Sequence, residues 1–134
     1  MKKETLTVER NEDGTTTYRN ANGQLHNPHG PAMVWADGEK EYYINGERHN
    51  PHGPAVINAD GDKAYWMHGQ LHNPDGPAVI WVNGQYKAYY INGQLHNPHG
   101  PAIVRANGDK FYYINGKPLT KAEFTAWQAE QAAK

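Results

Sequence analysis

The sequence predicts an all-β fold, an elongated and twisted single-layer antiparallel sheet of tandem β-hairpin repeats that ends in a capping helix. Three observations predict it. Residues 22–32 return letter for letter as residues 92–102. Short runs rich in β-branched and aromatic residues alternate with turns that contain Gly, Asn and Asp. A fixed period of this size is the mark of a repeat protein, in which one supersecondary unit stacks on itself. The period is given by marker glycines spaced 23, 23, 24 and 23 residues apart: Gly23, Gly46, Gly69, Gly93 and Gly116.

Composition narrows the classes of function. The chain of 134 residues has 13 Lys and Arg against 14 Asp and Glu, for a formal charge of −1, so it offers no strong field for duplex DNA. It contains no cysteine, which excludes disulfides and thiolate metal sites. No apolar run approaches the roughly 20 residues of a membrane helix, and the start lacks the apolar core of a signal peptide. We therefore expect a cytoplasmic protein without a membrane or duplex nucleic acid as partner.

Each repeat contains two runs of strand-like residues. The first run occupies residues 31–36, 54–59, 77–82 and 101–106. The second run occupies residues 40–44, 63–67, 87–91 and 110–114. Equivalent residues of different repeats need equivalent surroundings, so each repeat must reverse the chain an even number of times. The Asp-Gly turn between the runs makes one hairpin, and the segment Asn-Gly-x-Leu-His-Asn-Pro-His-Gly then forms one longer connection to the next hairpin.

Turn chemistry supports this layout. Asn-Pro-His-Gly suits a type I turn, because proline fixes φ at the second position and Asn and Gly favour the first and fourth. Asn45 and Gly46 provide a residue pair that tolerates positive φ. The N-terminal residues fit a degenerate hairpin, with a strand over residues 4–10, a turn at 11–14 and a return strand over 15–19.

We expect a single repeat domain over residues 1–134, with the degenerate hairpin in 1–21, the tandem repeats in 22–116 and a C-terminal helix in 117–134. Thr120 is the predicted N-cap of that helix, and Glu123 is its capping-box partner. Phe124 and Trp127 follow at helical spacing. The helix is expected to cover a sheet edge that would otherwise be free to pair with another chain.

Stacked repeats turn each offset into a column of side chains across the sheet. Alternation along the first run places small aliphatic residues on one face, which we assign to the packed side. This set comprises Ala32, Ala55, Ala78 and Ala102, then Val34, Ile57, Ile80 and Val104, then Ala36, Ala59, Val82 and Ala106. In the second run two aromatic columns lie on opposite faces: Tyr42, Tyr65, Tyr89 and Tyr112, and Tyr43, Trp66, Tyr90 and Tyr113.

Some columns change chemistry from copy to copy, which is how repeat proteins present a binding surface. Trp, Tyr and Arg are also the residue types that dominate binding hot spots. Two other interpretations stay open. A position also varies between repeats when it is exposed to solvent and tolerates many residues. The Tyr columns are also explained by a structural role, because a sheet with little helix cover needs large side chains to bury surface area. The predicted partner-binding residues are Trp35, Asn58, Trp81, Arg105, Tyr43, Trp66, Tyr90, Tyr113, Glu41, Phe111 and Arg48.

The histidines are concentrated in the loops. Seven of the eight lie at two offsets, which are His26, His49, His72 and His96, and His29, His52 and His99, while His68 replaces a turn Asn. A row of imidazoles is able to bind a transition metal. In the third repeat Asp75 stands where the second set has histidine. His and Asp both favour tight polar turns, which explains these positions without a metal. We therefore expect no metal site and no cofactor.

No catalytic motif is present. The sequence has no nucleophile elbow, phosphate loop or zinc-protease helix, and it has no serine at all. Carboxylates such as Asp37, Asp60 and Asp109 lie at hairpin turns, where turn geometry explains them. We therefore expect a protein that is not an enzyme.

The repeat Asn-Gly-x-Leu-His-x-x-x-Gly-Pro-Ala-x-x-x-x-x-Asp/Asn-Gly-x-Lys-x-Tyr-Tyr resembles the MORN-like hairpin repeats. It is most similar to a variant common in bacteriophages and giant viruses, whose proteins often end in a Leu-Thr-x-x-Glu-Phe helix like residues 119–124. The resemblance covers about residues 14–124. It implies sequential antiparallel hairpins without catalytic residues, and roles in protein scaffolding and, less securely, lipid binding. Bacterial relatives are described as antitoxins or immunity proteins. This chain has His-Asn-Pro-His where the usual loop has His-Arg-Glu-Asp, so functions tied to those charges are not carried over.

These observations lead to two hypotheses of function. The first is a non-catalytic protein-binding module, phage-encoded, that inhibits a host defence protein or acts as an antitoxin or immunity-type binder. The alternative is a protein that binds a small ligand, a nucleotide or a glycan, through its aromatic columns and its Asn and His loops. A homodimer through a free sheet edge is a further possibility.

Overall fold

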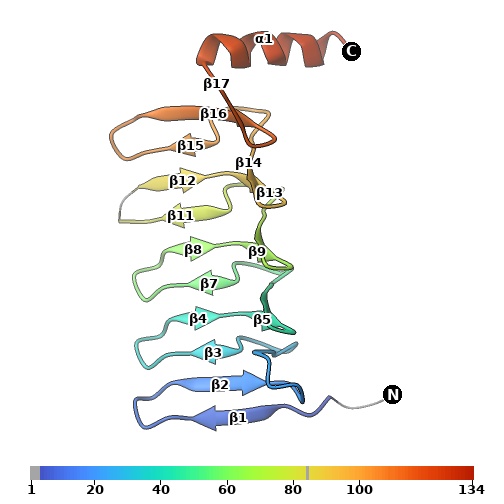
Figure 1. The fold of residues 1–134 in the computed structure, drawn as a ribbon. Helices are drawn as coiled ribbons and strands as arrows, with labels where there is room; N and C mark the ends of the chain where they lie inside the picture. The colour runs from blue at the N-terminus through green and yellow to red at the C-terminus, as the bar shows by residue number, and fades with distance from the viewer. Residues whose placement is uncertain (1–3, 84) are drawn as a thin grey trace. The chain divides into compact units, whose positions relative to one another are not determined.

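The computed structural model describes residues 4–83 and 85–134, and within them it confirms an all-β fold of antiparallel hairpins with one C-terminal helix (Figure 1). Residues 1–3 of the predicted N-terminal hairpin segment, and residue 84 in a predicted Asn-Gly turn, lie outside the described residues. The chain divides into two compact units, unit 1 (Met1–Gln70) and unit 2 (Leu71–Lys134).

In unit 1 the strands pair in the order β1-β2-β3-β4-β7-β8, and all these pairs are antiparallel. The bounds are β1 (Thr7–Arg10), β2 (Thr16–Arg19), β3 (Met33–Val34), β4 (Lys40–Glu41), β7 (Val56–Ile57) and β8 (Lys63–Ala64). A separate two-stranded piece joins β5 (Tyr43–Ile44) to β6 (Glu47–Arg48). After β8 the chain forms β9 (Trp66–Met67) and then β10 (Gln70–Leu71), which lies at the boundary of the unit.

Unit 2 repeats this plan with the order β11-β12-β15-β16-β17, again antiparallel throughout. The bounds are β11 (Val79–Trp81), β12 (Tyr86–Ala88), β15 (Ile103–Val104), β16 (Lys110–Ile114) and β17 (Lys117–Leu119). The small pair here is β13 (Tyr90–Ile91) with β14 (Gln94–Leu95). Helix α1 (Lys121–Ala132) completes the unit.

The strands are shorter than predicted, because the second run changes its partner at a tyrosine. The Tyr42 N–H donates to the Ala55 carbonyl at 2.7 Å, while the Tyr42 carbonyl accepts the His49 N–H at 3.1 Å. The backbone therefore leaves the main sheet there and enters a small hairpin of its own. The segment predicted as one longer connection thus contains a further hairpin, and only β16 keeps the whole predicted run of residues 110–114.

The predicted turn residues adopt the expected backbone. Asn45 and Gly46 have φ values of 48° and 83°, and the same positive pair recurs at each later marker glycine, with His68 taking the Asn place once. Positive φ at both central residues is what a two-residue type I′ hairpin requires. In the Asp-Gly turn, the Trp35 N–H donates to the Glu39 carbonyl at 3.0 Å, and Gly38 has a φ of 94°.

The predicted Asn-Pro-His-Gly turn is held by the side chain of its asparagine. Asn27 Oδ1 accepts the His29 N–H, and Asn27 Nδ2 donates to the Pro31 carbonyl, both at 3.0 Å. Asparagine favours this arrangement because its amide mimics a backbone turn. The same two bonds recur at Asn50, Asn73 and Asn97.

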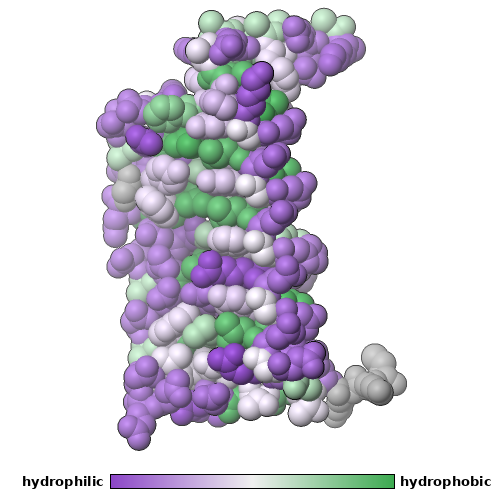
Figure 2. All heavy atoms as spheres, viewed as in Figure 1, coloured by the Kyte–Doolittle hydropathy of each residue, from purple (hydrophilic) through white to green (hydrophobic). Residues whose placement is uncertain are grey.

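The buried core under the strands of the main sheet is made of small residues. The first alanine of each predicted first run is fully buried, and the set comprises Ala32, Ala55, Ala78 and Ala102. The second column of the packed-side prediction, Val34, Ile57, Ile80 and Val104, is half-buried, but the third column is wrong, since residues 36, 59, 82 and 106 are exposed. The physical reason is that each strand of the first run ends before these positions, which therefore lie at the start of the turn. On the face drawn in Figure 2, hydrophobic side chains lie in rows over the strands, and hydrophilic ones cover much of both loop edges.

The two ends of the chain follow the sequence closely. The N-terminal hairpin forms as predicted, although its first strand begins at Thr7 and not at residue 4. Thr120 caps α1, and Thr120 and Glu123 make both bonds of the capping box. Residues 117–119, predicted as helix, instead form β17 against β16. Phe124 is the buried residue of the helix and lies 4.8 Å from the Tyr112 ring, measured between centroids.

Candidate binding surfaces

The predicted partner-binding residues lie on the same sheet face within each unit. Residues directly opposite in antiparallel strands share a face, and so do residues two apart along one strand. In unit 1, Glu41 lies opposite both Met33 and Val56, and Tyr43 lies opposite Arg48. In unit 2, Ile103 lies opposite both Ala88 and Phe111.

In unit 1 the structure brings four of these residues into one cluster. Tyr43 Oη donates to Glu41 Oε1 at 2.7 Å, and Arg48 Nη2 lies 3.2 Å from the same carboxylate oxygen. The Arg48 guanidinium carbon lies 5.1 Å from the Trp66 ring centroid, within range of a cation–π contact. Glu41 is buried, with 8% of its surface exposed. Its charge is therefore neutralised inside the unit.

The electrostatics of this cluster agree with its geometry. Burial raises the pKa of Tyr43, and the hydrogen bond to Glu41 adds to the rise. Burial alone would lower the pKa of Arg48, but its contacts with Tyr43 and Glu41 outweigh this and raise it. Arg48 therefore stays charged and Tyr43 stays neutral. The remaining predicted residues of unit 1, Trp35 and Asn58, are half-buried at the turn ends of β3 and β7.

In unit 2 an insertion precedes an aromatic pair, in which Trp81 is exposed and Tyr86 is half-buried. Four residues separate Trp81 from its partner Tyr86, whereas three separate Trp35 from Glu39 at the same offset of unit 1. The longer turn leaves Trp81 directly opposite Tyr86, with ring centroids 4.6 Å apart. Trp81 is 51% exposed. Sequence reasoning missed Tyr86, although the one spacing of 24 residues was the signal of the insertion.

The exposed row continues on the neighbouring strands. Lys87 lies opposite Val104, so Tyr86 and Arg105 are the next positions outward on that pair of strands. The Arg105 guanidinium carbon lies 4.9 Å from the Phe111 ring centroid. We call Trp81, Tyr86, Arg105 and Phe111 the aromatic row of unit 2. Arg105 and Phe111 are both exposed, Phe111 by 38%.

Tyr90 and Tyr113 lie further along the same face. Both are half-buried. Burial raises the pKa of Tyr90, and the nearby Tyr86 and Tyr113 phenols add to the rise.

The loop histidines divide into two groups with different roles. In the first group, each Nδ1 accepts a backbone N–H from the positive-φ residue of the next Asn-Gly turn, as His26 does from Asn45 at 2.8 Å. The other three bonds are each 2.9 Å long and join His49 to His68, His72 to Asn92 and His96 to Asn115. Each of these imidazoles therefore links its own loop to the turn of the next repeat.

The second group, His29, His52 and His99, is exposed, and only the backbone N–H of each is used in the loop. This explains why Asp75 replaces histidine there without changing the loop. His26 also lies 2.6 Å from Glu4, measured from Nε2 to Oε1, although the two are not aligned for a hydrogen bond. Within residues 4–83 and 85–134, no three His, Asp or Glu side chains converge on a position for one metal ion.

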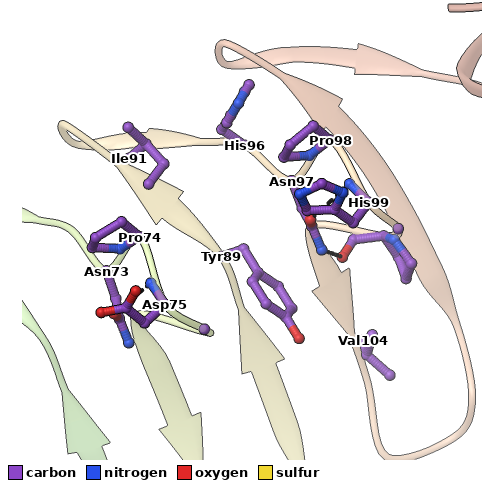
Figure 3. A pocket seen from close by; sticks show the side chains of 13 residues that line it. Asn73, Pro74, Asp75, Tyr89, Ile91, His96, Asn97, Pro98, His99 and Val104 are labelled. Atoms are coloured by element: carbon purple, nitrogen blue, oxygen red, sulfur yellow. Dashed lines mark hydrogen bonds between the residues drawn. The ribbon is translucent and has the colours of Figure 1, made fainter. Parts of the chain in front are cut away.

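Each unit has a groove between two successive Asn-Pro-x-Gly loops, on the face opposite the predicted binding residues. The Tyr42 groove of unit 1 has a volume of about 570 Å³ and is floored by Tyr42, Ile44 and Ile57. The Tyr89 groove of unit 2 has a volume of about 720 Å³ and is floored by the equivalent Tyr89, Ile91 and Val104 (Figure 3). Sequence reasoning placed tyrosines on this face but did not foresee that the loops would stand far enough apart to leave a groove.

Neither the family models nor the curated proteins searched contain a match to this chain. The MORN-like resemblance therefore remains an inference from the repeat motif. Among the described residues there is no helix with the length and apolarity needed to span a bilayer.

Proposed function

We propose that this chain is a non-catalytic protein-binding repeat module whose partner docks on the aromatic row of unit 2. The observation that carries the proposal is the Trp81–Tyr86 pair, which the longer turn holds on the surface. Trp, Tyr and Arg are the residues over-represented among binding hot spots, and this row contains all three. Trp81 on β11 and Phe111 on β16 lie at the two ends of the row, and both expose apolar surface of the kind that marks interaction sites.

The row is also suited to binding without large ordering costs. The Trp81 and Tyr86 rings contact each other at a tilt of 31°, and Arg105 lies over Phe111, so each of these side chains already has a neighbour in the free protein. Binding then loses less side-chain entropy than it would with four independent side chains. By the MORN-like resemblance, we propose that the partner is a host defence protein inhibited by a phage-encoded binder, or a toxin neutralised by an antitoxin or immunity-type protein.

Affinity capture with matched variants tests this proposal. Full-length protein is immobilised beside Trp81→Ala and Trp35→Ala, which remove the same side chain at the same offset of the two units. We expect Trp81→Ala to weaken binding of the captured partner by about thirtyfold, the effect of a hot spot of about 2 kcal/mol. Trp35→Ala should leave the affinity nearly unchanged, because its ring lies outside the aromatic row.

Calorimetry with the purified partner then measures both variants after their folding has been checked by circular dichroism. Equal losses in the two variants would argue against the aromatic row as the docking site. Full activity of a Trp81→Ala and Arg105→Ala double variant would overturn the proposal altogether.

A further inference from the structure

The walls of the Tyr89 groove are two loops that are each held by hydrogen bonds of their own asparagine. Asn73 Nδ2 donates to the Pro77 carbonyl, and Asn97 Nδ2 donates to the Pro101 carbonyl, each at 3.0 Å. The Oδ1 atoms of both asparagines accept backbone N–H groups inside their own loops. Each amide is thus bonded through both its oxygen and its nitrogen within its own loop, and these bonds shape the groove walls without a ligand. A preformed site binds with a smaller entropic cost.

Three polar side chains of the groove are left free for a ligand. Tyr89, Asp75 and His99 line it, and within the part of the chain that the structure describes none of their side chains makes a hydrogen bond. Figure 3 shows the Tyr89 ring standing between the loop that carries Asp75 and the loop that carries His99. His96 points away from that ring, and its Nδ1 is held by Asn115. The free groups therefore lie on Tyr89 itself and on the two loops that flank it.

The charge of the groove limits the chemistry of the ligand. All the lining residues are described, and they include one carboxylate, Asp75, but no Lys or Arg. A phosphate or carboxylate ligand would meet no cation and would be repelled by Asp75. A nucleotide is therefore disfavoured. The volume of about 720 Å³ lies in the usual range of small-ligand sites, about 300–1,000 Å³.

A neutral sugar fits what remains. The C–H face of a pyranose ring is weakly positive and matches the negative face of an aromatic ring. Its hydroxyls are able to donate to a carboxylate and to accept from or donate to an imidazole and a phenol. We propose that the Tyr89 groove binds a neutral carbohydrate, with one sugar ring on Tyr89 and its hydroxyls on Asp75 and His99.

Unit 1 provides an internal control for this site. Its Tyr42 groove has the same Tyr and Ile in the floor, with Ile57 in place of Val104, and the same kind of loops, but His29 stands where unit 2 has Asp75. This position contributes only its backbone N–H to the loop in both units. An exchange of the two side chains should therefore alter the ligand chemistry and leave the fold intact. The Tyr42 groove lacks the carboxylate acceptor, so we expect it to bind the same sugar more weakly.

The experiment uses the full chain and a panel of neutral oligosaccharides built from glucose, galactose, mannose and N-acetylglucosamine. Saturation-transfer NMR identifies binders, and calorimetry measures their affinity and stoichiometry. For the best binder, Asp75→His should lower the affinity of the unit 2 site by at least about tenfold, because a charged hydrogen-bond partner is lost. His29→Asp should raise the number of high-affinity sites from one to two. Trp81→Ala should have no effect, which separates this site from the aromatic row.

Two results would overturn the proposal. One is the absence of oligosaccharide binding at millimolar concentrations while the wild-type fold is intact. The other is binding that survives both Asp75→His and Tyr89→Ala, with folding of the variants confirmed by circular dichroism. Preferential binding of nucleoside phosphates from a parallel panel would also contradict it, because the groove would then have the opposite charge preference.

Discussion

The two units fill equivalent positions of their sheets in opposite ways. In unit 1 the position opposite Met33 holds Glu41, which pairs with Arg48. In unit 2 the equivalent positions hold Ala88, which is fully buried, and Leu95. A charged pair thus occupies the place of an aliphatic pair. A column that varies between repeats therefore has two possible causes. Glu41 and Arg48 differ from their equivalents as a pair, because each neutralises the charge of the other. Trp81 and Phe111 differ at positions where the side chain is exposed to solvent.

The units also differ in how their last hairpin is covered. In unit 2, Phe124 of α1 packs on Tyr112 and stacks with Trp127 at 6.0 Å between centroids. Within the described residues, unit 1 has no helix to do the same. Three predictions use these differences, from the largest expected effect to the smallest.

Phe124→Ala should lower the free energy of unfolding of unit 2 by about 3–4 kcal/mol, the usual cost of removing a buried Phe side chain. Urea unfolding followed by Trp fluorescence measures the loss. Hydrogen exchange should show reduced protection first in β16 and β17. Glu130→Ala, an exposed change on the same helix, serves as the control and should stay within about 0.5 kcal/mol. Equal effects of the two changes would mean that α1 does not cover the hairpin.

The charged pair of unit 1 should behave as one unit. Glu41→Ala alone should destabilise by about 1–2 kcal/mol, because Arg48 loses its carboxylate but remains partly screened by water. Arg48→Leu alone should cost about 2–3 kcal/mol, because it leaves Glu41 buried without its cation. The double change reproduces the Ala88 and Leu95 pair of unit 2 and should be close to wild type in stability. Additive losses in this double-mutant cycle, measured by urea unfolding, would contradict the coupling.

The smallest effect concerns pH and the His49–His68 contact, which has ring centroids 4.3 Å apart. Burial, and then the neighbouring His68, lower the pKa of His49, while Glu47 acts in the opposite sense. The unfolded chain therefore takes up the proton first as the pH falls below the ordinary histidine pKa of about 6.5. Stability should be full above that pH and decrease as the pH falls toward the lowered pKa of the folded state.

His68→Asn sharpens this test, because it restores the Asn found at the equivalent turns and removes the repulsive imidazole. Asn also tolerates the positive φ of 49° that His68 adopts. Unfolding free energies of the variant measured from pH 8 to pH 5 should fall less steeply than those of the wild type. An unchanged slope would show that the His68 ring does not affect the protonation of His49.

Much of the fold was readable from the sequence, and the reason is local chemistry. Asn-Gly pairs, Asp-Gly turns and the Thr120–Glu123 capping box each depend on contacts within a few residues, and the repeat then multiplies them. The sequence therefore determined the period, the hairpins, the buried alanines at residues 32, 55, 78 and 102, and the C-terminal cap.

Only the tertiary structure decided how residues distant in the sequence meet. It joined Glu41 to Arg48, set the Trp81 ring on Tyr86 and linked His26 to the backbone of Asn45, 19 residues away. It also ended the first-run strands before residues 36, 59, 82 and 106, and it opened the Tyr42 and Tyr89 grooves between successive loops. These features depend on the register and spacing of neighbouring strands, and a pattern within one repeat contains no information about the distance to the next.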